Sequence, residues 1–171
     1  NDTVPDKYKS YNVFCHKLNY SYADHRNSIL PILKSDYSFF FDADEKPAKH
    51  LLSELKYIIV SYDYPDLINI PRVNIVEGLE NNNKLKAAWK VVSGNVIAWE
   101  NGDYQSRILK NQIGLKWSGN LHERIYPEKS NTVHNIQKHP DYAIIHTKSL
   151  ERMLAVNQHY MEVYTRQENG I

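Results

Sequence analysis

The stretch DYSFFFDADEKP, residues 36–47, changes from apolar to acidic within a few positions and decides most of the fold prediction. Residues 37–41 are apolar without alternation, which is typical of a strand that is covered on both faces. Three of the next four residues are carboxylates, namely Asp42, Asp44 and Glu45. The stretch therefore predicts a buried strand that ends in an acidic turn.

A helix is predicted to follow this turn. Pro47 suits a first helical turn, and apolar residues then repeat at helical spacing: Ala48, Leu51, Leu52, Leu55 and Ile59. Before the stretch, residues 11–18 are predicted to form a strand and residues 22–34 a helix that Pro31 kinks or ends. Short connections between strands and helices favour an α/β domain with an at least partly parallel sheet.

The second half of the chain continues the alternation. Residues 68–78 alternate like a strand, in which Pro71 indicates an edge position or a bulge. Two extended segments are predicted within residues 104–126, and a last strand over residues 142–147 precedes a helix that opens at Ser149. The polar stretch at residues 81–92 leads into either a short helix or a strand. A single domain over residues 1–171 is predicted.

Composition excludes several classes of protein. Lys and Arg number 21 against 20 Asp and Glu, so no overall charge attracts nucleic acid or a membrane surface. Cys15 is the one cysteine, which excludes an internal disulfide and a cysteine-based zinc site and fits a reducing, cytoplasmic location. No apolar run approaches the length of a membrane span.

Two interpretations of the acidic cluster remain open from the residues alone. Asp44 can cap the following helix, with Glu45 favourable near the positive end of the helix dipole. Alternatively, Asp42 and Asp44 emerge at the carboxyl end of a strand, where open α/β sheets bind ligands. Two neighbouring carboxylates repel unless a cation lies between them, and oxygen donors suit Mg²⁺ or Mn²⁺ with a diphosphate as a further ligand.

Three segments in order resemble glycosyltransferases of the family-2 type, which have a GT-A fold. DHRNSILPILKSDYSFFFDADEKP (residues 24–47) resembles the family's Arg-Asn helix and Asp-x-Asp motif. DYQSRILKNQIGLKWSGNLHERI (residues 103–125) resembles its Arg-containing strand and Trp-Gly-x-x-His-Glu element. AIIHTKSLERMLAVNQHYMEVY (residues 143–164) resembles its closing strand and helix.

The resemblance implies a metal-dependent transfer of a sugar from a nucleotide diphosphate sugar to an acceptor hydroxyl. Asp42 and Asp44 would bind Mn²⁺ or Mg²⁺, with His146 as a further ligand. Arg26 would contact the donor diphosphate, and a planar cation suits that role. The donor pocket would also include Asp24, Asn27 and Ala43.

On the acceptor side, the resemblance implies that Glu123 takes the proton of the attacking hydroxyl in an inverting reaction. The alternative for Glu123 is an exposed carboxylate paired with His122 or Arg124. Four more residues would contact the acceptor or support those that do: Gln105, Arg107, Trp117 and His122. Trp117 either stacks on a sugar ring or belongs to the core. Asp103 is the next carboxylate to consider as a base.

Family members begin with a strand, a helix and a second strand that form a nucleotide-binding wall, and residues 1–8 match at most the tail of that region. Three alternatives stay open: the chain is a fragment, part of the protein is absent from this sequence, or a reduced relative has lost the wall. Two other function classes stay open. One is a noncatalytic carbohydrate-binding or structural module derived from a glycosyltransferase. The other is a metal-dependent enzyme of phosphoryl chemistry, although no glycine-rich phosphate loop is present.

Overall fold

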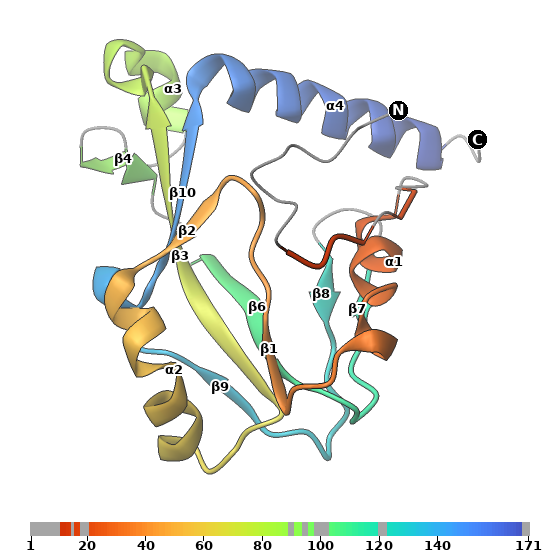
Figure 1. Ribbon diagram of the computed structural model, residues 1–171. Coiled ribbons are helices and arrows are strands. Elements are labelled where there is room, and N and C mark those ends of the chain that lie inside the picture. The colour runs from red at the N-terminus through yellow and green to blue at the C-terminus, as the bar shows by residue number, and fades with distance from the viewer. Residues whose placement is uncertain are drawn as a thin grey trace.

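A curled mixed sheet around the long strand β3 forms the middle of the molecule (Figure 1). The computed structural model describes residues 11–14, 16–17, 21–88, 91–93, 96–97, 103–119 and 123–168. The main sheet has the order β1-β6-β3-β10-β2, and β9, β5 and β4 extend it beside β3. The strands are β1 (Tyr37–Phe39), β2 (Glu45–Pro47), β3 (Leu67–Glu77), β4 (Val91–Ser93), β5 (Val96–Ile97), β6 (Asp103–Lys110), β7 (Trp117–Ser118), β8 (Arg124–Ile125), β9 (Val133–Asn135) and β10 (Ile144–Ser149).

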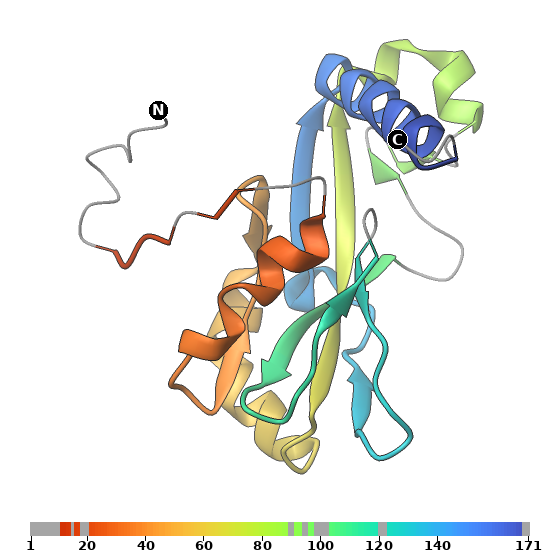
Figure 2. The same ribbon diagram turned by 90° about the vertical axis from the view of Figure 1, so that its right-hand side faces the viewer.

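Strand β3 is parallel to β9 and β10, whereas the other pairings are antiparallel. The prediction of a partly parallel α/β sheet is thus confirmed. The α-helices are α1 (Tyr22–Asn27), α2 (Lys49–Ser61), α3 (Asn83–Ala88) and α4 (Leu150–Glu168). Short 3₁₀ helices span Leu30–Ile32, Leu79–Asn81 and Pro140–Tyr142. Figures 1 and 2 show α2 and α1 on opposite sides of the sheet, with α4 across one end.

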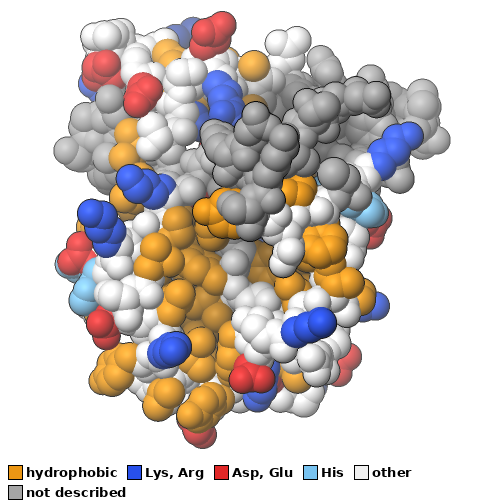
Figure 3. Space-filling model, viewed as in Figure 1, with side chains coloured by type: hydrophobic (Ala, Val, Ile, Leu, Met, Phe, Trp, Pro, Cys, Tyr) orange, Lys and Arg blue, Asp and Glu red, His pale blue; other side chains and the backbone are white. Residues whose placement is uncertain are grey.

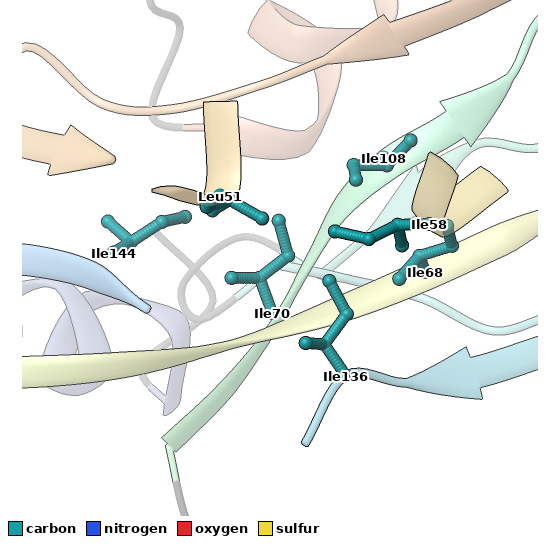
Figure 4. Close-up of a cluster of buried hydrophobic side chains, with 7 residues drawn as sticks. All are labelled: Leu51, Ile58, Ile68, Ile70, Ile108, Ile136 and Ile144. Atoms are coloured by element: carbon teal, nitrogen blue, oxygen red, sulfur yellow. The ribbon is translucent and has the colours of Figure 1, made fainter. Parts of the chain in front are cut away.

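Alternation along the strands gives the sheet an apolar cluster on each face. Ile68, Ile70 and Ile108 point towards α2, where they pack with Leu51, Ile58, Ile136 and Ile144 (Figure 4). Their neighbours Leu67 and Leu109 point to the other face and pack with Ala23, Trp117 and Ile125. Burying one such side chain completely stabilises the fold by about 1.5–3 kcal/mol.

The same alternation explains the apolar run at residues 37–41. Phe39 packs against the cluster below α2, and Phe40 packs against the cluster that contains Trp117. The rings of Phe40 and Trp117 meet edge to face, with 4.6 Å between their centroids. The prediction of a strand covered on both faces holds in part: Phe39 and Phe40 pack on opposite faces, but β1 ends at Phe39, its residues are only half-buried, and Phe41 is exposed.

The acidic turn does not cap a helix. Helix α2 begins at Lys49, its N-cap is Ala48, and no side chain makes a capping hydrogen bond there. Instead, residues 45–47 form β2, which pairs with β10 in the register Glu45 opposite His146. The capping interpretation of Asp44 and the placement of Pro47 in a first helical turn are therefore wrong.

Two further predictions are corrected by pairing. Pro71 lies neither in an edge strand nor at a bulge: it is paired with Tyr104 in the central strand β3, and the register shift falls between Ile68 and Asn69. On its other side, β9 ends opposite Asn69 and β10 begins opposite Arg72. Residues 11–14 and 16–17 form no strand. An apolar pattern becomes a strand only where a neighbouring strand pairs with its backbone. The rest of the predicted strand lies outside the described residues.

The other predicted helices and strands agree in order with those of the structure. Helix α1 ends at Asn27 and a 3₁₀ turn follows around Pro31, as the proline predicts. The stretch after residue 82 begins as a helix, α3. Among the described residues, no helix is both long and apolar enough to cross a membrane.

Candidate functional site

One face of the sheet changes from apolar to polar along β3 and β10. On β3, Ile70 belongs to the cluster below α2, and the next residues on that face are Arg72 and Asn74. On β10, Ile144 lies opposite Arg72, and His146 lies opposite Asn74. Helix α2 therefore covers one half of this face, and the other half carries a row of polar side chains.

A shift in strand register gives Arg107 its place. Ile68 lies opposite Ile108 but Asn69 lies opposite Ser106, so Arg107 is an additional residue in β6. Such bulges redirect side chains and are common beside functional sites. The Arg107 side chain is 3% exposed, and its Nη2 donates to Glu45 Oε1 at 2.6 Å and to Asp42 Oδ2 at 3.2 Å.

The acidic turn is closed by its own hydrogen bonds. Glu45 N donates to Asp42 O at 3.0 Å, and Asp42 N donates to Glu45 Oε2 at 2.9 Å. Burial pushes the pKa of Asp42 upward, but the charges of Arg107 and Arg26 more than offset burial and hold this pKa below its usual value. Asp42 therefore stays ionised at neutral pH.

Arg26 of α1 connects the acidic turn to Glu123. Its Nη2 donates to Asp42 Oδ1 at 2.5 Å, and its Nε donates to Glu123 Oε1 at 2.6 Å. Its guanidinium carbon lies 5.8 Å from the centroid of the Trp117 ring. Burial alone would lower the pKa of Arg26, but Asp42 and Glu123 raise it above its usual value. Glu123 is thus not the surface partner of Arg124.

A second set of polar contacts surrounds Asp103. Arg72 Nε donates to Asp103 Oδ2 at 2.7 Å, and Arg72 Nη1 lies 3.4 Å from Glu45 Oε1. Asn74 Nδ2 and Gln105 Nε2 donate to the two oxygens of Asp103 at 2.8 and 2.6 Å. Burial raises the pKa of Asp103, but Arg72 and these amides lower it overall. Asp103 is consequently a poor candidate for a base.

Asp44 and His146 meet at the end of this network. His146 Nε2 lies 3.2 Å from Asp44 Oδ2, and Arg152 Nη2 of α4 lies 3.2 Å from the same oxygen. On the other side of the ring, His146 Nδ1 is 2.9 Å from Asn74 Oδ1. Because Asn74 Nδ2 donates to Asp103, Asn74 Oδ1 accepts, and His146 Nδ1 carries the ring proton.

The protonation of His146 bears on metal binding. Burial, together with the charges of Lys148 and Arg72, lowers the pKa of His146 by more than Asp44 raises it, which favours the neutral imidazole at pH 7. Its Nε2 then presents a lone pair towards the Asp44 carboxylate beside the cation of Arg152, and two acceptors at this distance also suit a metal ion that both can share. An imidazole oriented through its other nitrogen is typical of metal ligands.

Asp44 has one arginine partner, Arg152 on Oδ2, whereas both carboxylate oxygens of Asp42 accept from arginines, so Asp44 and His146 are the better candidates for a divalent ion. Within the described residues, no group of three or more His, Cys, Asp or Glu side chains is arranged to hold a metal ion. A two-residue anchor matches an ion that takes its other ligands from a substrate phosphate and water, as Mg²⁺ commonly does.

A pocket of about 290 Å³ opens beside Arg26 and Asp42. Ala43 lines it, and most of its remaining wall is aromatic: Phe14, His16, Tyr22, His25, Phe40 and Phe41. Aromatic walls with a cation at one end suit a ligand that combines a flat ring with an anionic group.

A second pocket, of about 590 Å³, lies between α2 and the neighbouring ends of β1 and β6, and its lining includes Lys56, Ile59, Tyr64 and Lys110. Figure 3 shows hydrophobic side chains gathered over this lower part of the molecule. None of the residues of the polar network lines this pocket.

The remaining predicted residues that the structure describes do not line the pocket beside Arg26. Asp24 is exposed in the first turn of α1. Asn27 fastens α1 to β7, because its side chain donates to Trp117 O and accepts from Trp117 N, each at 2.9 Å. Trp117 is buried in the core, so the core alternative is the one that the structure supports. His122 lies outside the described residues.

The sequence predicts that Arg107 either contacts the acceptor or supports residues that do. Its side chain is buried, so it supports Asp42 and Glu45 and does not contact an acceptor. The sequence interpretation missed the network residues Arg72, Asn74 and Arg152, and it gave Glu45 only a minor role. A signal for two of them existed, because Arg72 and Asn74 are the polar exceptions in an otherwise apolar face of β3.

Comparisons with known proteins do not narrow the class of protein beyond the mixed α/β domain that the fold defines. The chain matches no protein-family model, and a search of curated proteins gives no match.

Proposed function

We propose that the protein is a glycosyltransferase of GT-A-like fold that transfers a sugar from a nucleotide diphosphate sugar to an acceptor hydroxyl. One observation carries the proposal: residues from the three segments that resemble the family's motifs lie in one polar network beside an aromatic pocket. These residues include Arg26, Asp42, Asp44, Glu123 and His146.

The proposed roles follow from position. The aromatic pocket takes the nucleoside, and Arg26 takes the diphosphate. Asp44 and His146 would hold Mn²⁺ or Mg²⁺, which stabilises negative charge on the departing diphosphate. The acceptor oxygen attacks the anomeric carbon as its bond to the diphosphate breaks, and Glu123 takes the proton of the hydroxyl. Direct displacement inverts the configuration at that carbon.

A second candidate is a noncatalytic carbohydrate-binding or structural module. The observation in its favour is that Asp42, Glu45 and Asp103 are each paired with arginine, so the network neutralises its own charge without a ligand. In that case the network stabilises the fold and the pocket binds a sugar or an aromatic ring.

A thermal-shift screen of nucleotide diphosphate sugars, with and without Mn²⁺, separates the two candidates. A ligand that binds only the folded state raises the melting temperature. Stabilisation by a sugar nucleotide that requires Mn²⁺, followed by transfer to an acceptor, supports the enzyme. A response to free sugars alone, without any dependence on metal, supports the module.

A further inference from the structure

Arg26 is shared unequally by two carboxylates. Asp42 accepts from Arg26 and also from the buried Arg107, so it keeps a partner if Arg26 moves. Within the described part of the chain, Glu123 accepts a hydrogen bond from Arg26 only, through Oε1. The weaker attachment is therefore the one between Arg26 and Glu123.

The charges around Arg26 oppose an incoming anion. One guanidinium lies between two carboxylates, and the side chains of Arg26 and Glu123 are only 14% and 15% exposed. An anion that enters the adjacent pocket meets a cation whose charge is already balanced, next to two negative groups. Binding to Arg26 is favourable only if one carboxylate gives up its place.

From this arrangement we propose that a diphosphate displaces Glu123 from Arg26, and that this exchange leaves Glu123 without its cationic partner. The inference rests on the proposed function, because the exchange assists the reaction only if the freed carboxylate, Glu123, is the base. Donor binding and activation of the base are then one event. Asp42, held by Arg107, keeps the acidic turn in place during the exchange.

Thermodynamic coupling makes the exchange measurable without any transfer reaction. If diphosphate and Glu123 compete for Arg26, removing the charge of Glu123 strengthens diphosphate binding. A merely structural role of Glu123 has the opposite effect, since a loosened site binds an anion less tightly. The direction of the change therefore separates the two roles.

The experiment is calorimetric titration with inorganic pyrophosphate in metal-free buffer. Four proteins are compared: wild type, Glu123→Gln, Arg26→Gln and the double variant Glu123→Gln/Arg26→Gln. Glu128→Gln is the matched control, because Glu128 is exposed and its backbone N donates to Asn131, outside the polar network of Arg26. Glu123→Gln is expected to bind pyrophosphate about 5- to 150-fold more tightly than wild type, the usual range for coupled sites.

Glu128→Gln is expected to match wild type, and the gain is expected to vanish in the double variant. Unchanged or weaker binding by Glu123→Gln overturns the inference, as does a gain that persists without Arg26 or no pyrophosphate binding by any of the proteins. Failure of the proposed function looks different. In that case the affinity gain is present but no sugar nucleotide is turned over, whereas transfer without the gain refutes only the exchange.

Discussion

Arg107 of β6 and Glu45 of β2 form a 2.6 Å ion pair between two strands that are not neighbours in the sheet, with side chains 3% and 0% exposed. The pair ties the acidic turn to the middle of the curled sheet. Arg107 Nε is also buried and has no hydrogen-bond partner among the described residues. The arrangement therefore fixes the position of the turn more than it adds stability.

Arg107→Met is expected to lower the free energy of unfolding by about 3–5 kcal/mol, because it leaves the buried Glu45 carboxylate with Arg72, at 3.4 Å, as its remaining arginine partner. Urea denaturation measures the effect. Arg124→Met, at an exposed arginine of β8, is the control and should change stability by less than about 0.5 kcal/mol. The double variant Arg107→Met/Glu45→Leu should recover much of the loss, and a single variant as stable as wild type contradicts the expectation.

Asp44→Asn and His146→Gln are each expected to weaken Mn²⁺ binding in the presence of a nucleoside diphosphate by at least about tenfold. Asn74→Leu removes the acceptor that orients His146 and should cost about 10- to 100-fold. Calorimetric titration with Mn²⁺ measures all three.

The matched control for these metal-site variants is Asp141→Asn, since Asp141 and His139 form an exposed Asp–His contact of 3.6 Å elsewhere. Equal losses in the control and in Asp44→Asn would mean that the measurement reports nonspecific binding. Full Mn²⁺ affinity in Asp44→Asn would remove that carboxylate from the site.

The lowered pKa of Asp103 predicts a loss of stability in acid. The ionised carboxylate stabilises the folded state fully above its ordinary pKa of about 4, and this contribution disappears as the pH falls through the lower pKa of the folded protein. At pH 6, Asp103→Asn is expected to melt about 3–10 °C below wild type. Melting curves at intervals from pH 6 to pH 3 should show that difference shrinking, whereas a constant difference would rule out ionisation as its source.

Glu123→Gln is expected to reduce sugar transfer by about two to four orders of magnitude at saturating donor and acceptor, because Gln keeps the shape of the side chain but accepts no proton. The sugar nucleotide should still bind. The measurement is the initial rate of transfer with each candidate donor that stabilises the protein. Near wild-type turnover in this variant would place the base elsewhere, and Asp103, with three donors around it, would be a poor substitute.

Sequence patterns predicted the order of strands and helices well where the pattern follows directly from which side chains are buried. The apolar run at residues 37–41 lacks alternation because Phe39 and Phe40 enter different clusters, and the pattern itself contains that information. The pattern at residues 11–18 was misleading, since nothing in a local pattern says whether a partner strand is present. The cap at Asp44 was wrong for a similar reason: β2 forms because β10 lies beside it.

The candidate site was predicted in part. Arg26, Asp42 and Glu123 were singled out and lie in direct contact, across 16 and 97 residues of chain. Arg72 and Asn74 were missed because alternation separates the two faces of a strand but does not tell which half of a face is covered by a helix. That depends on the length and position of α2, which only the folded structure gives.

The polar network also bears on the order of folding. Its bonds close long segments of chain: 97 residues from Arg26 to Glu123, 65 from Asp42 to Arg107 and 72 from Asn74 to His146. Contacts of such wide sequence separation have a large loop-closure entropy and form slowly. The network is therefore expected to be absent from the transition state, so substitutions within it should accelerate unfolding and leave the refolding rate nearly unchanged.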